Sequence, residues 1–341
     1  MGAKHSKKKG QGETSVQQPS APTPAAPVKP SKGLAESRIL QTECFAFSDP
    51  GFGAVDEENQ DMALAATRLP GDDAKYVAGI FDGHGPEGRA VAMRIKERVV
   101  SVLAANKCRH NSHTAEDMVG EEADAPATTS EAPGTTEHSL QFVRSFMELE
   151  AACISIHSDS GACATIVVFD ETERRLLIAN VGDSKAVLGR VKEPLMVQLT
   201  EDHYPSVKEE RERIVAAGGR VAAAIDVQFG ELGPPRVWKG DSDSPGLPLS
   251  RTIGDALAKE IGVTATPHVA DLVLTPEDRF LIVGSSGMWK VLTPQETVEV
   301  VSKQTDVKSA AKKLVDEAKR RYEVLWQGEN TSALVIAFPV P

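Results

Sequence analysis

The fold is decided by the stretch Tyr76–Gly85, which reads YVAGIFDGHG. Its apolar run is bounded by turn-forming residues, a pattern typical of a buried strand. We therefore predict a strand with Asp82 at its end, where the backbone is open to a ligand. His84 follows in the same stretch. A carboxylate and an imidazole are thus expected together at one end of a sheet.

A second strand is expected just upstream, over residues 58–67, joined to the first by a hairpin. With a turn centred between Gly71 and Asp72, the antiparallel register places Asp61 opposite Asp82. Paired like charges are costly unless a cation or a proton lies between them. All-oxygen clusters suit hard ions such as Mg²⁺ or Mn²⁺. The hairpin therefore predicts a metal site; an ordinary Asp-Gly turn beside a solvated acid is the alternative interpretation.

Composition bounds the class of protein. The chain has 341 residues and 40% hydrophobic content, enough for one large domain or two small ones. A net charge of −11 argues against general nucleic-acid binding. The four cysteines show no metal-binding spacing and there is no secretory leader, so we expect reduced thiols in a cytoplasmic protein. No stretch approaches the roughly 18 apolar residues that span a bilayer, so any membrane contact is expected at the N-terminus.

The N-terminus reads MGAKHSKKK, which fits the pattern for N-myristoylation of Gly2. A single myristoyl chain binds membranes only marginally, so a second signal is needed. Basic residues near an anionic leaflet contribute about 1 kcal/mol each, and the tail offers Lys4, Lys7, Lys8 and Lys9. We therefore predict that residues 1–33 are a disordered tail that holds the protein peripherally on a membrane. A chance match ahead of a solvated basic tail is the alternative.

Residues 34–341 are expected to form the folded domain, interrupted by an acidic insertion at 110–138. The insertion contains seven acidic residues and no lysine or arginine, a composition typical of disorder. Two interpretations stay open for it, a partner-binding or regulatory loop and a tolerated surface excursion.

Short apolar strands alternate with helices along the domain. A mixed apolar segment over 34–47 is expected to be an edge strand, and an amphipathic helix is expected after Gly88, where apolar residues recur every four positions. Most strands are expected to lie in antiparallel hairpins with helical segments between them. The pattern therefore favours an α+β fold, an antiparallel β-sandwich flanked by α-helices on both faces.

Nine stretches, in order along the chain, resemble one family, the metal-dependent Ser/Thr protein phosphatases of type 2C. They are ENQD at 58–61, FDGHG at 81–85, SGACA at 160–164, ANVGDSKAVL at 179–188, LTEDHYP at 199–205, ERERIVAAGGRV at 210–221, LPLSRTIGD at 247–255, LIVGSSGMWKVLT at 281–293 and ENTSALVIAF at 329–338. The resemblance implies a central pair of antiparallel sheets flanked by helices, with a site for two Mg²⁺ or Mn²⁺ ions at one edge. It also implies the reaction, attack of a metal-bound hydroxide on phosphoserine or phosphothreonine.

The resemblance implies a role for each matching residue. Asp82 stands at the position of the bridging carboxylate, Gly83 at that of the backbone carbonyl ligand and His84 at that of the general acid. Asp61 matches an acid that holds metal-bound water. Asp183 matches an aspartate associated with an additional, weaker metal.

Three departures from the family's pattern put the metal site in doubt. Ser286 and Lys290 stand where the family carries two acids, the first of which is a metal ligand. Glu329 replaces an aspartate ligand, which keeps the charge but moves the oxygens by one methylene. The run 49–61 has no basic residue, although family members usually place an arginine or lysine there to hold the substrate phosphate.

These departures predict a pseudophosphatase. The replacements at Ser286 and Lys290 together change the local charge by about three units, and each unit at 4 Å changes the interaction energy by roughly 1–4 kcal/mol. We expect Lys290 to pair with Asp82 in place of an ion, and the protein to bind a phosphoprotein, a kinase or another signalling partner. The alternative is an active phosphatase that uses one metal or a site rebuilt with Glu329 and Asp183. A site repurposed for a nucleotide or lipid is a third hypothesis.

Overall fold

The computed structural model describes residues 35–39, 42–51, 58–110, 137–192, 195–226, 228–326 and 328–339. The chain divides into two compact units, Met1–Ser31 and Lys32–Pro341, and all described residues belong to the second. The expected lipidated tail at 1–33 therefore lies outside the described residues. Among the described helices, none is both long and apolar enough to cross a membrane.

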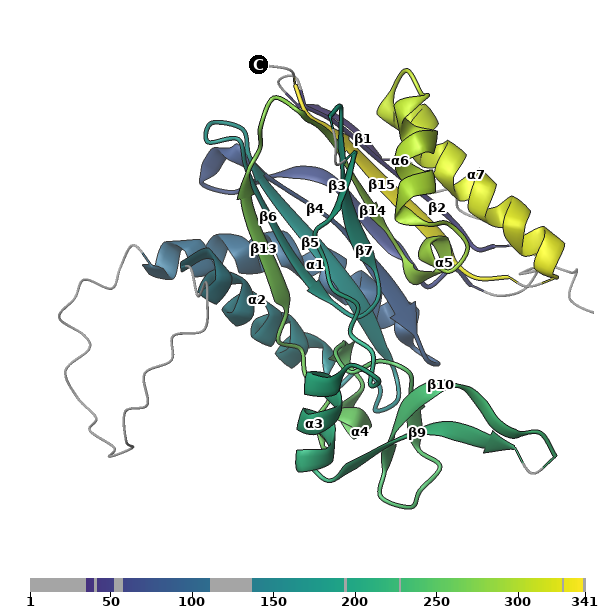
Figure 1. Ribbon diagram of the computed structural model, residues 1–341. Helices are drawn as coiled ribbons and strands as arrows, with labels where there is room; N and C mark the ends of the chain where they lie inside the picture. The colour runs from purple at the N-terminus through teal and green to yellow at the C-terminus, as the bar shows by residue number, and fades with distance from the viewer. Residues whose placement is uncertain are drawn as a thin grey trace, which may run out of the picture. The chain divides into compact units, whose positions relative to one another are not determined.

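Two antiparallel sheets form the centre of the second unit (Figure 1). The first sheet has the order β1-β2-β15-β14-β7-β8, with strands β1 Ala35–Ile39, β2 Thr42–Asp49, β15 Thr331–Ala337, β14 Asp278–Gly284, β7 Lys185–Arg190 and β8 Met196–Gln198. The second has the order β13-β6-β5-β4-β3, with strands β13 His268–Val273, β6 Arg175–Val181, β5 Gly161–Asp170, β4 Asp72–His84 and β3 Met62–Leu69. The short strand β12, Ile253–Gly254, pairs with β5.

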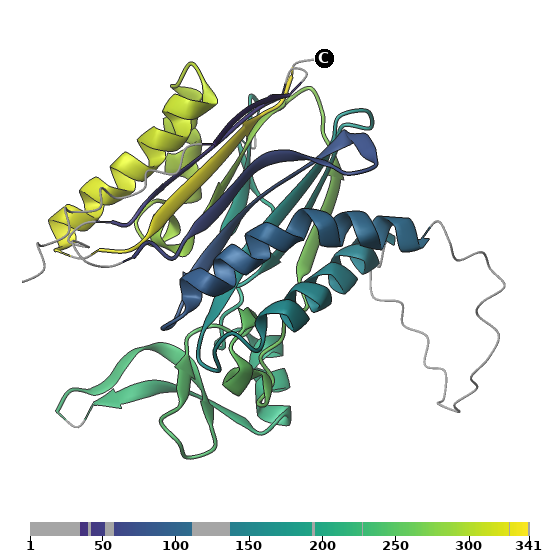
Figure 2. The same cartoon turned by 180° about the vertical axis from the view of Figure 1, so that it is seen from behind.

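Helices cover the outer face of each sheet (Figure 2). The second sheet is covered by α1 Gly88–His110 and α2 Glu137–Cys153, and the first by α5 Ser286–Trp289, α6 Pro294–Ser302 and α7 Val307–Leu325. Val91 and Ile95 of α1 are fully buried in one cluster with Phe81 of β4. Leu314 of α7 is buried in another with Val335 of β15. The predicted α+β fold, an antiparallel sandwich flanked by helices, is confirmed.

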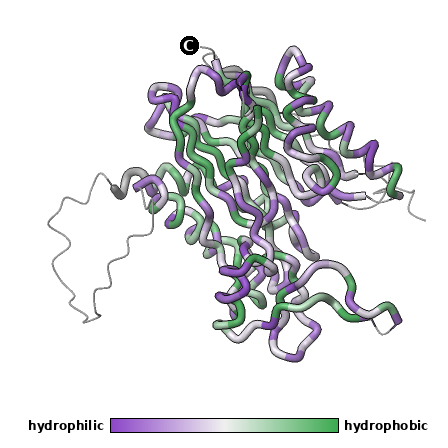
Figure 3. The backbone as a smooth tube through the Cα atoms, viewed as in Figure 1, coloured by the Kyte–Doolittle hydropathy of each residue, from purple (hydrophilic) through white to green (hydrophobic). Residues whose placement is uncertain are grey.

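The space between the sheets is filled by apolar side chains. Ile80 and Val167 from the second sheet belong to one buried cluster with Leu281 and Leu334 from the first. Figure 3 shows this apolar centre as the green strands, with the hydrophilic residues concentrated toward the loops and helix surfaces. A core between two sheets fixes their separation, so the strand ends that carry the candidate site residues are held in place.

A smaller lobe adjoins one end of the sandwich (Figures 1 and 2). It consists of α3 Lys208–Ala216, α4 Ala256–Lys259 and a third sheet of β9 Gly219–Asp226, β10 Gly230–Lys239 and β11 Pro245–Leu247. Ile214 and Val237 are fully buried in the core of the lobe. The lobe carries the segment 245–249 to the cavity at the end of β4.

The register of the β3–β4 hairpin is the predicted one at its functional end. Met62 pairs with Phe81, so the next facing positions are those of Asp61 and Asp82. Residues Tyr76–Phe81 of β4 are buried on both faces of the sheet, with Val77 and Phe81 in the cluster under α1 and Ile80 in the cluster between the two sheets.

The predicted turn of that hairpin is wrong by one residue. Leu69 pairs with Asp72, which leaves Pro70 and Gly71 as the turn. Gly71 has φ +79°, a conformation that favours glycine. Register shifts along β3 compensate for the earlier turn and restore the predicted pairing near the site.

Two other boundaries differ from those predicted. The segment 34–47 was expected to form one edge strand, but it contributes to the β1–β2 hairpin, and β2 lies inside the sheet between β1 and β15. The acidic insertion was placed at 110–138, but α1 includes His110 and α2 begins at Glu137. Its remaining residues, 111–136, lie outside the described residues.

Candidate functional site

Asp82 lies near the end of β4, where that strand pairs with Cys163 of β5. Its Oδ2 atom accepts a hydrogen bond of 2.8 Å from the backbone N–H of Ser286, the first residue of α5. Where the family resemblance implies a second carboxylate, the structure therefore gives Asp82 a neutral backbone donor. This hydrogen bond supplies no further negative charge for a dication.

Asp61 immediately precedes β3 and faces Asp82. Only 3% of its surface is exposed. Its Oδ2 atom accepts a hydrogen bond of 2.7 Å from the Ser332 hydroxyl, whereas its buried Oδ1 atom has no partner among the described residues. Burial raises the pKa of Asp61 well above its usual range, and the neighbouring Asp82 carboxylate raises it further. An unpartnered buried carboxylate oxygen beside a like charge is satisfied by a cation or a proton.

Gly83 continues β4 between Asp82 and His84. A Cβ atom at this position would lie 2.4 Å from the Gly88 carbonyl oxygen and 2.8 Å from the Gln60 carbonyl oxygen, so no larger residue fits. The tight packing at Gly83 brings the start of α1 and the residues before β3 close to the candidate ligands.

Asp183 follows the end of β6 and is almost fully buried. Its carboxylate accepts hydrogen bonds from the Cys163 thiol at 3.4 Å and from the Tyr204 hydroxyl at 3.2 Å. Burial raises the pKa of Asp183, and the nearby Asp82 carboxylate adds to this effect. Asp82 is therefore within electrostatic range of both Asp61 and Asp183.

His84 forms a close pair with Asp255, with 2.8 Å between Nε2 and Oδ2. Burial alone would lower the pKa of His84, but the Asp255 carboxylate, assisted by those of Asp82 and Asp183, raises it. Burial opposes ionisation of Asp255, yet His84 lowers its pKa. A Cβ atom at Gly161 would lie 2.1 Å from Asp255 Oδ2, so the glycine makes room for the pair.

Asp255 was missed as a site residue, although it ends the stretch LPLSRTIGD that was already quoted for the resemblance. A glycine followed directly by an acid, as at Gly182 and Asp183, was the available signal. Cys163 and Tyr204, the partners of Asp183, were also missed. A cysteine within a strand and a tyrosine in a loop carry no such signal.

Lys290 pairs with Glu329 rather than with Asp82, which corrects the predicted ion pair. Its Nζ atom lies 2.6 Å from Glu329 Oε2, and both side chains are partly exposed. Burial lowers the pKa of Lys290, but the hydrogen bond to Glu329 and the Asp183 and Asp82 carboxylates outweigh it, so the pKa is raised. The ion pair engages the Glu329 carboxylate, which the resemblance implies as a metal ligand.

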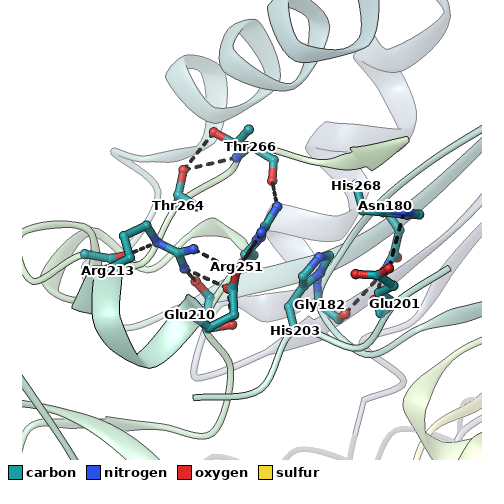
Figure 4. A network of polar contacts seen from close by, with 12 residues as sticks. Asn180, Gly182, Glu201, His203, Glu210, Arg213, Arg251, Thr264, Thr266 and His268 are labelled. Carbon is teal, nitrogen blue, oxygen red and sulfur yellow. Dashed lines mark hydrogen bonds and ion pairs between the residues drawn. The ribbon is translucent and has the colours of Figure 1, made fainter. Parts of the chain in front are cut away.

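A network of polar contacts includes Gly182, the residue that precedes Asp183 (Figure 4). The Glu210 carboxylate of α3 accepts hydrogen bonds from Arg213 at 2.7 and 2.8 Å and from Arg251 at 2.6 Å. The backbone N–H of Gly182 donates to His203 Nδ1 at 3.1 Å. The network thereby fixes the residue before Asp183 and the segment that leads to Asp255.

A cavity of about 360 Å³ is lined by Asp82, Asp183, Asp255, His84 and Lys290, together with Arg236 and residues 245–249 of the lobe. Over the ranges that the structure describes, no group of three or more His, Cys, Asp or Glu side chains is arranged to hold a metal ion. The unpartnered Asp61 oxygen, Asp82 and the Gly83 carbonyl nevertheless fit one hard cation in their donor chemistry. The side of Asp82 that faces Ser286 and Lys290 does not fit a second one, because it offers a neutral donor and an ammonium.

Known proteins resemble this chain in sequence and in fold. The family model described as "Protein phosphatase 2C" matches residues 48–323. The chain is 34% identical over 279 residues to "Probable protein phosphatase 2C 73" of Oryza sativa subsp. japonica, a match that covers 77% of this chain and 65% of that protein. It is 32% identical over 273 residues to "Probable protein phosphatase 2C 73" of Arabidopsis thaliana, covering 78% and 70%.

Among solved structures, the "serine-threonine phosphatase 2C from Toxoplasma gondii" superposes with a TM-score of 0.70 at 21% identity, covering 91% of this chain and 100% of that one. A "C.elegans sex determining protein" superposes with a TM-score of 0.65 at 18% identity, covering 88% and 66%. At these identities the likeness shows the fold alone. The family model and the plant relatives go further, and with them the chain belongs to the protein phosphatase 2C family.

Proposed function

We propose that this chain binds phosphorylated protein in the cavity at the end of β4 and dephosphorylates serine or threonine there, as a Mg²⁺- or Mn²⁺-dependent phosphatase with a reduced metal centre. The pair of Asp61 and Asp82 carries the proposal. A buried acid with an unpartnered oxygen beside a second acid is relieved by a cation. The relatives named as probable phosphatases support catalysis rather than binding alone.

The chain's own residues supply the acid for the reaction. The Asp61 and Asp82 carboxylates and the Gly83 carbonyl would hold the ion, which when bound lowers the pKa of water and orients the phosphoryl oxygens. His84 has a raised pKa and can give its proton to the leaving serine or threonine oxygen. Asp255 holds the ring at 2.8 Å and stabilises its protonated form.

A second candidate, a pseudophosphatase that binds a phosphoprotein or kinase without turnover, is favoured by the Lys290–Glu329 ion pair. That pair and the neutral donor of Ser286 occupy the side of the site where a second ion would need negative charge. Losing even an indirect partner of a metal ligand commonly costs about 10- to 100-fold in metal affinity or activity. The loss of a direct ligand therefore weighs toward binding without catalysis.

Turnover of a phosphothreonine peptide by the full chain separates the two candidates. A phosphatase releases phosphate with added Mn²⁺ or Mg²⁺ and stops when EDTA removes the metal. A pseudophosphatase binds the peptide but releases no phosphate above the enzyme-free background. Metal-dependent release by the wild type would defeat the second candidate, and its absence at millimolar Mn²⁺ would defeat the first.

We also propose that the chain is anchored to a membrane through myristoylated Gly2 and its following lysines. The sequence motif alone supports this part, because the tail lies outside the described residues. Cell fractionation tests it by comparing the wild type with Gly2→Ala. The anchored protein is expected in the membrane fraction and the variant in the cytosol; equal partitioning would contradict the proposal.

A further inference from the structure

The cavity at the end of β4 has an unusual balance of charge for a site that admits a phosphate dianion. Four acids line it, namely Asp82, Asp159, Asp183 and Asp255, against two permanent cations. The family's usual phosphate-holding base is missing from residues 49–61. A dianion entering such a cavity needs positive charge from elsewhere, since like charges repel strongly away from bulk water.

Arg236 is the cation of the cavity that no acid engages. Its Nη1 atom donates to the Gly246 carbonyl at 2.8 Å, and across the described part of the chain no carboxylate lies within ion-pair distance of it. Lys290, by contrast, is paired with Glu329. Arg89, which is also near the site, pairs with Glu58 at 2.7 Å. A guanidinium has five N–H donors, so Arg236 keeps four for a ligand.

The lobe holds Arg236 in position from both sides. β10 pairs with β9 at Arg236 and Ala222, and the carbonyl that orients the guanidinium comes from β11. Gly246 cannot be replaced by a larger residue without strain, because a Cβ atom there would lie 2.7 Å from the Trp238 ring and its φ is +67°. A half-buried arginine on paired strands loses little further freedom when it binds an anion.

We propose that Arg236 is the phosphate-binding residue of this chain, supplied by the lobe in place of the base missing before Asp61. The inference rests on the proposed binding of phosphorylated protein but not on turnover. The guanidinium binds two phosphoryl oxygens through parallel N–H donors, a geometry that an ammonium cannot reproduce. The ligand class is a phosphomonoester dianion on serine or threonine.

The test is binding of inorganic phosphate and of a fluorescent phosphothreonine peptide to the full chain in EDTA, which removes any contribution from metal. We expect Arg236→Gln to weaken both by about 10-fold or more and Arg236→Lys to recover only part of the loss. The matched control is Arg220→Gln in the neighbouring strand. Arg220 also donates to backbone carbonyls, those of Gly240 and Ser242, but it does not line the cavity.

The outcomes separate this inference from the proposed catalysis. If the wild type releases no phosphate yet its peptide binding depends on Arg236, catalysis fails and the inference holds. Equal binding by Arg236→Gln and wild type, with matching thermal unfolding, overturns the inference whatever the turnover. So does a wild type that binds the phosphorylated and unphosphorylated peptides alike, or an Arg220→Gln variant that loses as much affinity as Arg236→Gln.

Discussion

The two sides of Asp82 differ in charge and in how their acids are satisfied. On one side, Asp61 is buried, has an unpartnered oxygen and experiences the repulsion of Asp82. On the other, a backbone N–H from Ser286 satisfies Asp82, and Glu329 is neutralised by Lys290. The first side is electrostatically incomplete without a cation, whereas the second is already balanced by the protein.

Under the proposed function, this difference means that the fold keeps one half of a metal centre and has lost the other. The backbone at both sides is held by the same sandwich, since β4, β14 and β15 all belong to its core. Only side-chain chemistry separates them. Asp82 lies between the two sides, so changes there should affect metal binding most.

The largest expected effect follows from removing the shared acid. We expect Asp82→Ala to lower metal-dependent phosphate release by at least about 100-fold, because a direct ligand counts for more than the indirect partners whose loss costs 10- to 100-fold. Phosphate release under saturating Mn²⁺ measures it. Asp241→Ala, an exposed acid of the lobe, is the control. Unchanged turnover in Asp82→Ala would show that catalysis does not use this site.

Acid should lower the free energy of unfolding through His203, which accepts a hydrogen bond from the backbone of Gly182 beside the site. Burial, with Arg251 adding to it, lowers the pKa of His203 from 6.5 to about 3. The unfolded chain then binds a proton that the folded chain does not, so this contribution to stability is present above pH 6.5 and is lost as the pH falls. Between pH 6.5 and 4.5 the loss is about 2–3 kcal/mol. Below pH 4.5, protonation of Glu210 adds to this loss of stability. Burial raises the pKa of Glu210, but its hydrogen bonds to Arg213 and Arg251 lower it by more.

Urea unfolding at pH 7, 5.5 and 4.5 measures this effect, with His203→Gln as the reference. Asp61 acts in the opposite direction, because its raised pKa makes the folded state take up a proton as the pH falls. The difference between wild type and His203→Gln removes that contribution. If the two show the same pH dependence, His203 is not held neutral in the folded protein.

Restoring the lost charges tests the second side directly. We expect the double variant Ser286→Asp, Lys290→Asp to raise Mn²⁺ affinity by about 10- to 100-fold, because it returns a ligand and frees Glu329 from its ion pair. Lys303→Asp, on an exposed residue at the end of α6, changes a lysine to the same acid away from the cavity. An affinity no higher than that of this control would contradict the assignment of the defect to Ser286 and Lys290.

The smallest expected effect concerns stability without metal. We expect Asp61→Asn to raise the free energy of unfolding in EDTA by about 1 kcal/mol, because it removes a buried like charge while its amide oxygen can still accept from Ser332. Thermal unfolding measures the change. Added Mn²⁺ should stabilise the wild type more than the variant. A variant less stable than wild type in EDTA would show that the two acids do not repel appreciably.

Much of this arrangement could be predicted from the sequence, because it depends on periodicity and local turns. The apolar run that ends at Asp82 marks the strand, and the hairpin turn before it placed Asp61 opposite Asp82, even though that turn was predicted one residue late. Asp183 likewise comes directly after a glycine at the end of a strand. Such signals lie within a few residues of each other.

Contacts between distant segments could not be predicted in the same way. Lys290 was expected to pair with Asp82, but it pairs with Glu329, which lies 39 positions along the chain, shortly before β15. Asp255 reaches His84 across 171 positions of sequence. Arg236 comes from a lobe whose position against the sandwich is set by tertiary packing, which no local pattern records.

Calorimetric titration of the full chain with Mn²⁺ tests most directly the claim that one side of Asp82 accepts an ion and the other does not. We expect one ion per chain in the wild type, no binding in Asp82→Ala, and a second ion only in the Ser286→Asp, Lys290→Asp variant. Two ions of comparable affinity in the wild type, or no binding at all, would contradict the claim.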